Sequence, residues 1–197
     1  EYYYSIYYPV SNPDLIYLGA QDNGTNRYDG TNWEQVYGAD GMEALVDYTD
    51  DNIVYVSSQG GSLQKSTDGG NTFNDISPTY GGAWTTPYVM HPTNSLILFA
   101  GYDDVYKTTD GGSFWNAIST GLTGGATIRT LVVANSDPNY IYAGILGDLY
   151  MTSDGGTGWS SISAGLPVSS VPITGLAVSD SDPQSIWVTF SGYTSGE

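Results

Sequence analysis

The chain has 197 residues, of which 21 are Asp or Glu and only four are Lys or Arg, so its formal net charge is −17. Nucleic acid is excluded as a partner, because binding it depends on neutralising phosphates with basic side chains. No run of apolar residues is long enough to span a bilayer, so we expect no membrane insertion, and the absence of Cys excludes disulfides and thiolate metal sites.

The composition favours short strands over helices. All but four of the acidic residues are Asp, which favours turns, whereas Glu favours helices. The chain also contains 26 Gly, 18 Tyr and 5 Trp. Aromatic residues are enriched in strands and Gly in the turns that join them, so the composition predicts an all-β protein with many Gly/Asp turns.

A short motif recurs along the chain at an interval typical of repeat folds. It occupies residues 66–73, 108–115 and 152–159, where Asp68, Asp110 and Asp154 stand 42 and 44 residues apart. A shorter copy without the leading hydroxyl lies at 28–33. We call the three full copies the box loops. A period of this size predicts an architecture of stacked supersecondary units.

Each repeat divides into four predicted strands. The first strands fall at 5–10, 42–48, 88–90, 128–134 and 173–178, and each is followed by a Pro/Asp/Asn turn. The second strands centre on Ile-Tyr-like triplets at 16–18, 54–56, 97–99, 141–143 and 186–188. The third strand of each repeat runs into the box loop and the fourth begins at its aromatic residue. Four antiparallel strands per repeat predict a β-propeller blade.

The repeats cover the whole chain as one β-propeller segment. The predicted blades lie at about 1–37, 38–78, 79–120 and 121–165, followed by a half blade at 166–197. Because the fifth repeat has only its first two strands, we expect the segment to be an incomplete part of a larger propeller that belongs to a larger polypeptide.

The box loops have a mechanical interpretation. An Asp in a turn can accept backbone N–H bonds, the second Gly can take a positive φ, and the hydroxyl can bond locally. We therefore predict a structural role for the box residues, namely Ser66, Asp68, Gly70, Phe73, Thr108, Asp110, Gly112, Trp115, Thr152, Asp154, Gly156 and Trp159.

The motif resembles Ser-x-Asp-x-Gly-x-Thr-Trp, the signature of the Asp-box propellers, also called bacterial neuraminidase repeat or sortilin-like propellers. That family includes sialidases, xyloglucan-degrading hydrolases, sortilin and photosystem assembly factors. The first blade is most similar to large secreted bacterial surface proteins that are labelled glycosyl hydrolases. Departures from the signature are Phe73 in place of Trp, and Phe114 and Gly158 in place of Thr. The resemblance implies a secreted or cell-surface location.

Strand alternation places the box loops and the turns between first and second strands at one end of every blade. The loops between second and third strands and the crossovers to the next blade, which we call the remaining loops, lie at the other end. Carboxylates, amides and aromatic side chains gather on these remaining loops. Such a mixture suits a sugar, whose ring stacks on aromatics while its hydroxyls bond to polar groups. The candidate ligand-binding residues are Asn23, Tyr37, Tyr80, Trp84, Tyr102 and Asp103.

Catalysis would need a pair of acids on the same face, and the candidates are Asp22, Asp40 and Glu43. The alternative is that Asp22 and Asp40 are turn residues and Glu43 faces a wet central channel. Calcium is a third possibility, because Asp and Asn oxygens suit it, but no calcium-loop motif supports it. We expect no metal and no cofactor.

Two catalytic classes find little support. The sialidases of the resembling family bind the substrate carboxylate with three arginines, whereas this chain has only Arg27 and Arg129. A Ser-His-Asp triad is disfavoured because His91 is the sole histidine and falls in a predicted turn.

The sequence therefore predicts a secreted or cell-surface β-propeller module that binds a glycan or a surface or secreted protein. The alternative is a glycoside hydrolase that uses acids on the face opposite the box loops. Because the net charge is strongly negative, we expect the ligand to be neutral or cationic, or an anion bridged by a divalent metal, and a neutral glycan is the first choice.

Overall fold

The computed structural model describes residues 3–7, 9, 12–79, 81–168 and 171–192. They form five antiparallel sheets. The first sheet contains β1 (Tyr3–Tyr7), β2 (Ile16–Ala20), β3 (Gly24–Tyr28) and β4 (Trp33–Tyr37). The second contains β5 (Gly41–Asp47), β6 (Asp50–Ser58), β7 (Ser62–Ser66) and β8 (Asn74–Asp75). The third contains β9 (Tyr88–Met90), β10 (Leu98–Gly101), β11 (Val105–Thr108) and β12 (Trp115–Ala117).

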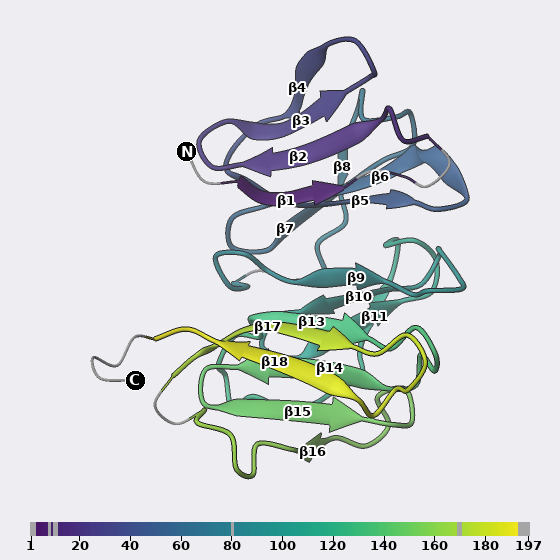
Figure 1. The fold of residues 1–197 in the computed structure, drawn as a ribbon. Coiled ribbons are helices and arrows are strands. Elements are labelled where there is room, and N and C mark those ends of the chain that lie inside the picture. The colour runs from purple at the N-terminus through teal and green to yellow at the C-terminus, as the bar shows by residue number, and fades with distance from the viewer. Residues whose placement is uncertain (1–2, 8, 10–11, 80, 169–170, 193–197) are drawn as a thin grey trace.

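The fourth sheet contains β13 (Thr130–Val133), β14 (Ile141–Ile145), β15 (Asp148–Thr152) and β16 (Ser160–Ser161). The fifth consists of β17 (Ile173–Val178) and β18 (Ile186–Phe190). In the four-stranded sheets, each strand pairs with the next in chain order, so every sheet is a meander. Figure 1 shows the first four sheets one after another from top to bottom, with the fifth sheet, β17 and β18, drawn over the fourth in this view.

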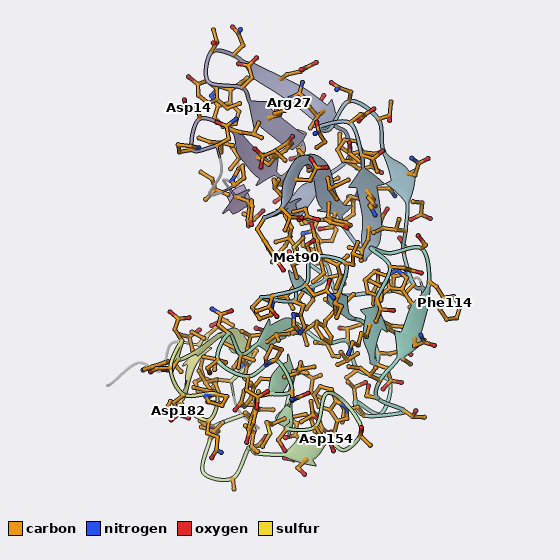
Figure 2. All side chains as sticks on the ribbon, turned by 90° about the vertical axis from the view of Figure 1, so that its right-hand side faces the viewer. Asp14, Arg27, Met90, Phe114, Asp154 and Asp182 are labelled. Atoms are coloured by element: carbon orange, nitrogen blue, oxygen red, sulfur yellow. The ribbon has the colours of Figure 1, made fainter. Side chains whose placement is uncertain are left out.

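The sheets follow an arc around an open axis, as the view in Figure 2 shows. The first strands of neighbouring sheets contact one another, as in the pairs β1 with β5 and β13 with β17, so these strands lie nearest the axis. This arrangement confirms the predicted β-propeller fold, of which the chain forms a part. The box loops therefore emerge on one face of the arc, and the remaining loops emerge on the opposite face.

Strand positions agree with the sequence except at a few ends. The first strand was expected at 5–10, whereas β1 covers Tyr3–Tyr7 and part of the expected range falls outside the described residues. The strand expected at 128–134 is shorter, because β13 covers only Thr130–Val133. The outer strands β8 and β16 have two residues each, which limits the sheet edge that they expose.

The core lies between the sheets rather than inside any one of them. One buried cluster joins the first two sheets through Tyr17, Val46 and Val54. Further clusters join each following pair of sheets, and the third and fourth sheets meet at Phe99 and Ile141. Each sheet thus buries its apolar face only against its neighbours, as in other repeat architectures.

Hydrogen bonds from the box aromatics add a polar connection between consecutive sheets. The Trp115 indole N–H donates to the Ile76 carbonyl at 2.7 Å, and that of Trp159 donates to the Ile118 carbonyl at 2.9 Å. The second box glycine packs at the same place: Gly112 has φ +97°, and a Cβ there would lie 2.7 Å from the Ile76 side chain. The box aromatic therefore fixes its sheet to the preceding one.

The first box glycine makes a second connection, this time through its carbonyl. The Tyr17 hydroxyl, on the first sheet, donates to the Gly69 carbonyl of the second at 2.9 Å, and Arg27 donates to the same oxygen. Lys65, on the second sheet, donates to the Gly111 carbonyl of the third at 2.9 Å. Each of these box loops is thus held from the sheet before it.

The fifth sheet has an exposed aromatic at the position where earlier sheets have buried ones. Trp187 on β18 is 61% exposed, whereas Tyr17 and Tyr55 on the corresponding strands β2 and β6 are buried. Within the part of the chain that the structure describes, β18 pairs only with β17. No described sheet covers Trp187, as expected for part of a propeller.

We predict that Trp159→Phe lowers the free energy of unfolding by roughly 1 to 2 kcal/mol, because the Ile118 carbonyl loses its donor. Urea denaturation followed by circular dichroism measures the change. The matched control is Trp33→Phe, at the corresponding position of the first sheet, where no described residue accepts the indole N–H and the ring is 52% exposed. Equal losses in the two variants would contradict a role for the inter-sheet bond.

Candidate functional site

The box loops carry repeated carboxylates, as a ligand site would. The Asp68 carboxylate accepts the backbone N–H groups of Asn71 and Thr72 at 3.0 and 2.8 Å. It also accepts the hydroxyls of Ser66 and Thr72, each at 2.7 Å. The loops around Asp110 and Asp154 repeat the backbone and hydroxyl contacts. These carboxylates are thus engaged within their own loops.

The hydrogen bonds also account for the acidity of the box carboxyls. The side-chain and backbone hydrogen bonds of Thr72, followed by that of Ser66, lower the pKa of Asp68 to about 2. Backbone N–H groups from Phe114 and Gly158 are the main cause of the lowered pKa of Asp110 and Asp154, respectively. The loops therefore favour the charged carboxylate.

This shift predicts how stability depends on pH. Because the pKa of Asp68 is lower in the folded protein than the ordinary 3.8, its contribution to stability is complete above about pH 4 and is lost as the pH falls to about 2. Asp68→Asn should flatten the fall in melting temperature over this range. The control is Asp14→Asn, in an exposed turn. A slope in Asp68→Asn that equals that of the parent protein would refute this account.

The opposite ends of the sheets, which we call the front face, carry the predicted catalytic acids. The Asp40 carboxylate accepts the backbone N–H of Asp22 at 2.8 Å, and the Asp40 N–H donates to the Gln59 side chain at 3.1 Å. Asp22 has φ +61° and Ala39 has φ +64°, so both loops hold residues in the left-handed region. Asp22 and Asp40 thus lie together, and Asp40 fixes the backbone of the Asp22 loop.

Glu43 lies on β5, one strand nearer the axis, and is half-buried. Burial raises the pKa of its carboxyl to about 7. Its backbone N–H donates to the Ser57 hydroxyl at 3.0 Å, and its carbonyl accepts the Tyr88 hydroxyl at 2.9 Å. The backbone at Glu43 is therefore fixed, and its carboxyl exchanges protons near neutral pH.

Two predicted ligand-binding aromatics serve the core instead. Tyr102 has 0% exposure, and its hydroxyl donates to the Gly61 carbonyl at 2.5 Å. The expectation that Tyr102 contacts a ligand is therefore wrong, because its ring is covered by neighbouring sheets. Tyr37 packs edge-on against Phe73, with ring centroids 5.4 Å apart, between the first and second sheets.

The remaining predicted residues lie on exposed loops of the front face or outside the described residues. Asn23 is exposed, and its carbonyl accepts the Gln35 side chain at 2.8 Å. Asp103 is exposed beside Asp104, whose carboxylate accepts the Ser119 hydroxyl at 2.6 Å and stabilises the loop. Tyr80 lies outside the described residues.

Trp84 is the predicted residue with the most exposed aromatic surface on this face, at 54%. It lines an open groove of 480 Å³, formed by the segment before β9, the segment before β13 and the start of β17. The lining residues are Gly82, Ala83, Trp84, Thr85, Thr127, Arg129, Ile173 and Thr174.

The groove is connected to the predicted acidic loops through backbone hydrogen bonds. The Gly60 N–H donates to the Trp84 carbonyl at 3.2 Å, and the Gly82 N–H donates to the Gly60 carbonyl at 3.0 Å. Gly60 follows Gln59, whose side chain accepts the Asp40 N–H. The loop 59–61 thus braces both the Trp84 segment and the loop that holds Asp40.

Arg129 is the groove residue that sequence reasoning missed as a ligand contact. The sequence places it after the 123–127 loop on the face opposite the box loops, and otherwise counts it only as one of two arginines where a sialidase needs three, without a role in binding. Its place beside Trp84 depends on the packing of segments more than 40 residues apart. Its rarity could have singled it out in the sequence, since the chain has only four basic residues.

His91 has the turn role that the sequence predicted. Its Nδ1 accepts the backbone N–H of Thr93 at 3.2 Å, the bond that Asp50 and Asp137 make in the corresponding turns. Burial, together with the charge of Lys107, lowers the pKa of His91. Across the described ranges, no three His, Asp, Glu or Cys side chains are grouped to hold a metal, and no helix suited to crossing a membrane is found.

Comparisons with known proteins identify the fold. No protein-family model matches the sequence, and no curated protein matches it either. Among solved structures, an ancestral GH74 enzyme has a TM-score of 0.75 at 18% identity, covering 95% of this chain and 27% of that one. The GH74 xyloglucanase from Xanthomonas campestris has a TM-score of 0.72 at 16% identity, covering 94% of this chain and 33% of that one.

A structure of YCF48 bound to a D1 peptide is also similar, with a TM-score of 0.51 at 14% identity, covering 95% of this chain and 74% of that one. At these identities the likeness shows the β-propeller fold. The chain spans about a third or less of the length of the two GH74 structures.

Proposed function

We propose that this chain is part of an Asp-box β-propeller module, secreted or on the cell surface, that binds a carbohydrate on its front face. The observation that carries the proposal is the exposed Trp84 ring beside the open groove. A large aromatic surface that stays exposed next to a concavity is a feature of binding sites.

The chemistry of the groove fits a sugar. The Trp84 ring offers an apolar surface on which the C–H face of a sugar ring can stack. Thr85, Thr127 and Thr174 line the same groove. The Thr85 hydroxyl donates to the Met42 sulfur at 3.4 Å, and the Thr174 hydroxyl is hydrogen-bonded to that of Thr189 at 3.1 Å. A hydroxyl oxygen engaged in this way can still accept a hydrogen bond from a sugar hydroxyl. The groove thus offers both a stacking surface and hydrogen-bonding groups to one bound ring.

The compared proteins support two classes of partner. The GH74 xyloglucanase acts on a glycan, and the YCF48 structure contains a peptide. The carbohydrate class is preferred because the groove combines one stacking surface with several hydroxyls, whereas a peptide-binding groove would offer apolar pockets for side chains. If a carbohydrate screen finds no binding, a protein partner on the same face is the remaining class.

We predict that Trp84→Ala weakens glycan binding roughly tenfold or more, because the stacking surface is removed. A glycan array identifies the ligand and calorimetry measures the affinity. The matched control is Phe114→Ala, which removes an aromatic side chain that is 65% exposed on a box loop, at the other end of the sheets. Unchanged affinity in Trp84→Ala, or equal losses in both variants, would contradict the proposed site.

A glycoside hydrolase is the second candidate function, and the raised pKa of Glu43 favours it. A carboxyl that stays protonated near pH 7 can act as a general acid, while Asp22 or Asp40 would be the second acid of the pair. The position of Asp40 argues for a structural role, since its carboxylate already accepts the Asp22 N–H.

We expect binding without turnover, because Asp40 is engaged in holding the Asp22 loop. The assay is release of reducing ends from the array ligand by the parent protein, Glu43→Gln, Asp22→Asn and Asp40→Asn. The hydrolase would be favoured over a pure binding function if the parent protein shows turnover and Glu43→Gln loses turnover but still binds the ligand.

A further inference from the structure

Two of the four basic side chains serve the contacts between sheets, and a third packs within its own sheet. Arg27, Lys65 and Lys107 occupy the same position on β3, β7 and β11. Arg27 and Lys65 bind the box glycine carbonyls of the next sheet. The Lys107 ammonium lies over the Phe99 ring at 5.4 Å from its centroid. These cations are therefore committed to the fold.

Arg129 is placed differently. It precedes β13, where its backbone N–H donates to the Gly144 carbonyl at 2.8 Å, while the residue itself is exposed and lines the groove. Among the described residues the one ion pair joins Arg27 to Glu34 at 2.8 Å. No described carboxylate thus neutralises Arg129.

The charge inside the groove is opposite to that of the whole molecule. No Asp or Glu is among its lining residues, and Arg129 is its one charged group. At physiological ionic strength the Debye length is about 8 Å, so a ligand in contact with Arg129 is governed by this guanidinium more than by distant carboxylates. The expectation of a neutral ligand, which used only the total charge of −17, does not describe this groove.

We infer that the groove binds an acidic sugar, a uronic acid residue whose ring stacks on Trp84 and whose carboxylate pairs with Arg129. This inference rests on the proposed carbohydrate-binding function and names its ligand class. A planar guanidinium can donate two parallel hydrogen bonds to a carboxylate, which gives orientation as well as affinity. The oxygens of the lining threonines can then accept hydrogen bonds from the ring hydroxyls.

The test compares uronate oligosaccharides with their methyl esters, which keep the ring but remove the charge. The probes are tetragalacturonate, tetramannuronate and a hyaluronan tetrasaccharide, each paired with its ester, and calorimetry gives the affinities. We expect the parent protein to bind at least one acid form about tenfold more tightly than its ester. Arg129→Gln should remove this preference, and Arg129→Lys should restore part of it.

Trp84→Ala separates the inference from the function on which it rests. This substitution should weaken the binding of the acid form and of the ester by similar factors, since stacking does not depend on the charge. Melting temperatures equal to that of the parent protein show that the variants are folded. Acid and ester forms bound equally, or an acid preference that survives in Arg129→Gln, would overturn the uronate assignment while leaving carbohydrate binding in place. Failure to bind any acid form would overturn it as well, and neutral glycans on the array then test the proposed function separately.

Discussion

Contacts between a box loop and the preceding sheet are what the rest of this structure depends on. A meander of two to four short strands buries too little apolar surface to be stable alone, so each sheet needs its neighbours. The apolar clusters between sheets supply most of that burial. The indole N–H of Trp115 or Trp159 and the glycine carbonyls of the loops then fix how consecutive sheets are placed. Directional bonds of this kind select one arrangement among several that apolar packing alone would allow.

This constraint determines where the charges of the molecule can act. The box carboxylates are engaged by their own loops, Arg27 and Lys65 lie at contacts between sheets, and Lys107 packs on Phe99 within its own sheet. On the opposite face the contacts between sheets are mainly backbone bonds, such as those of Gly60, and there the chain leaves an exposed tryptophan and an arginine beside one groove. Strand alternation separates the two faces, so a ligand on the front face does not compete with the box-loop contacts.

The period of the box loops was sufficient to predict the fold, because a propeller repeats one hydrogen-bonding unit that can be recognised from its turn residues. Alternation likewise predicted that Asp22 and Asp40 approach each other. Local patterns could not show that Tyr102 is buried, since whether a residue after a strand points to solvent or to the next sheet depends on packing. Nor could they place Arg129 beside Trp84, because three separate segments meet to form the groove. The indole N–H groups bond to the backbone carbonyls of Ile76 and Ile118, and residue type does not reveal a backbone acceptor.

The central claim is that the box loops build the fold and the front face binds the ligand. Hydrogen exchange of the protein with and without a bound oligosaccharide tests it most directly, because both faces are observed in one experiment. The account predicts slower exchange on binding at 82–85, 127–130 and 173–174, with no change at 66–72, 108–114 and 152–158. Slower exchange confined to the box loops, with none around Trp84, would contradict it.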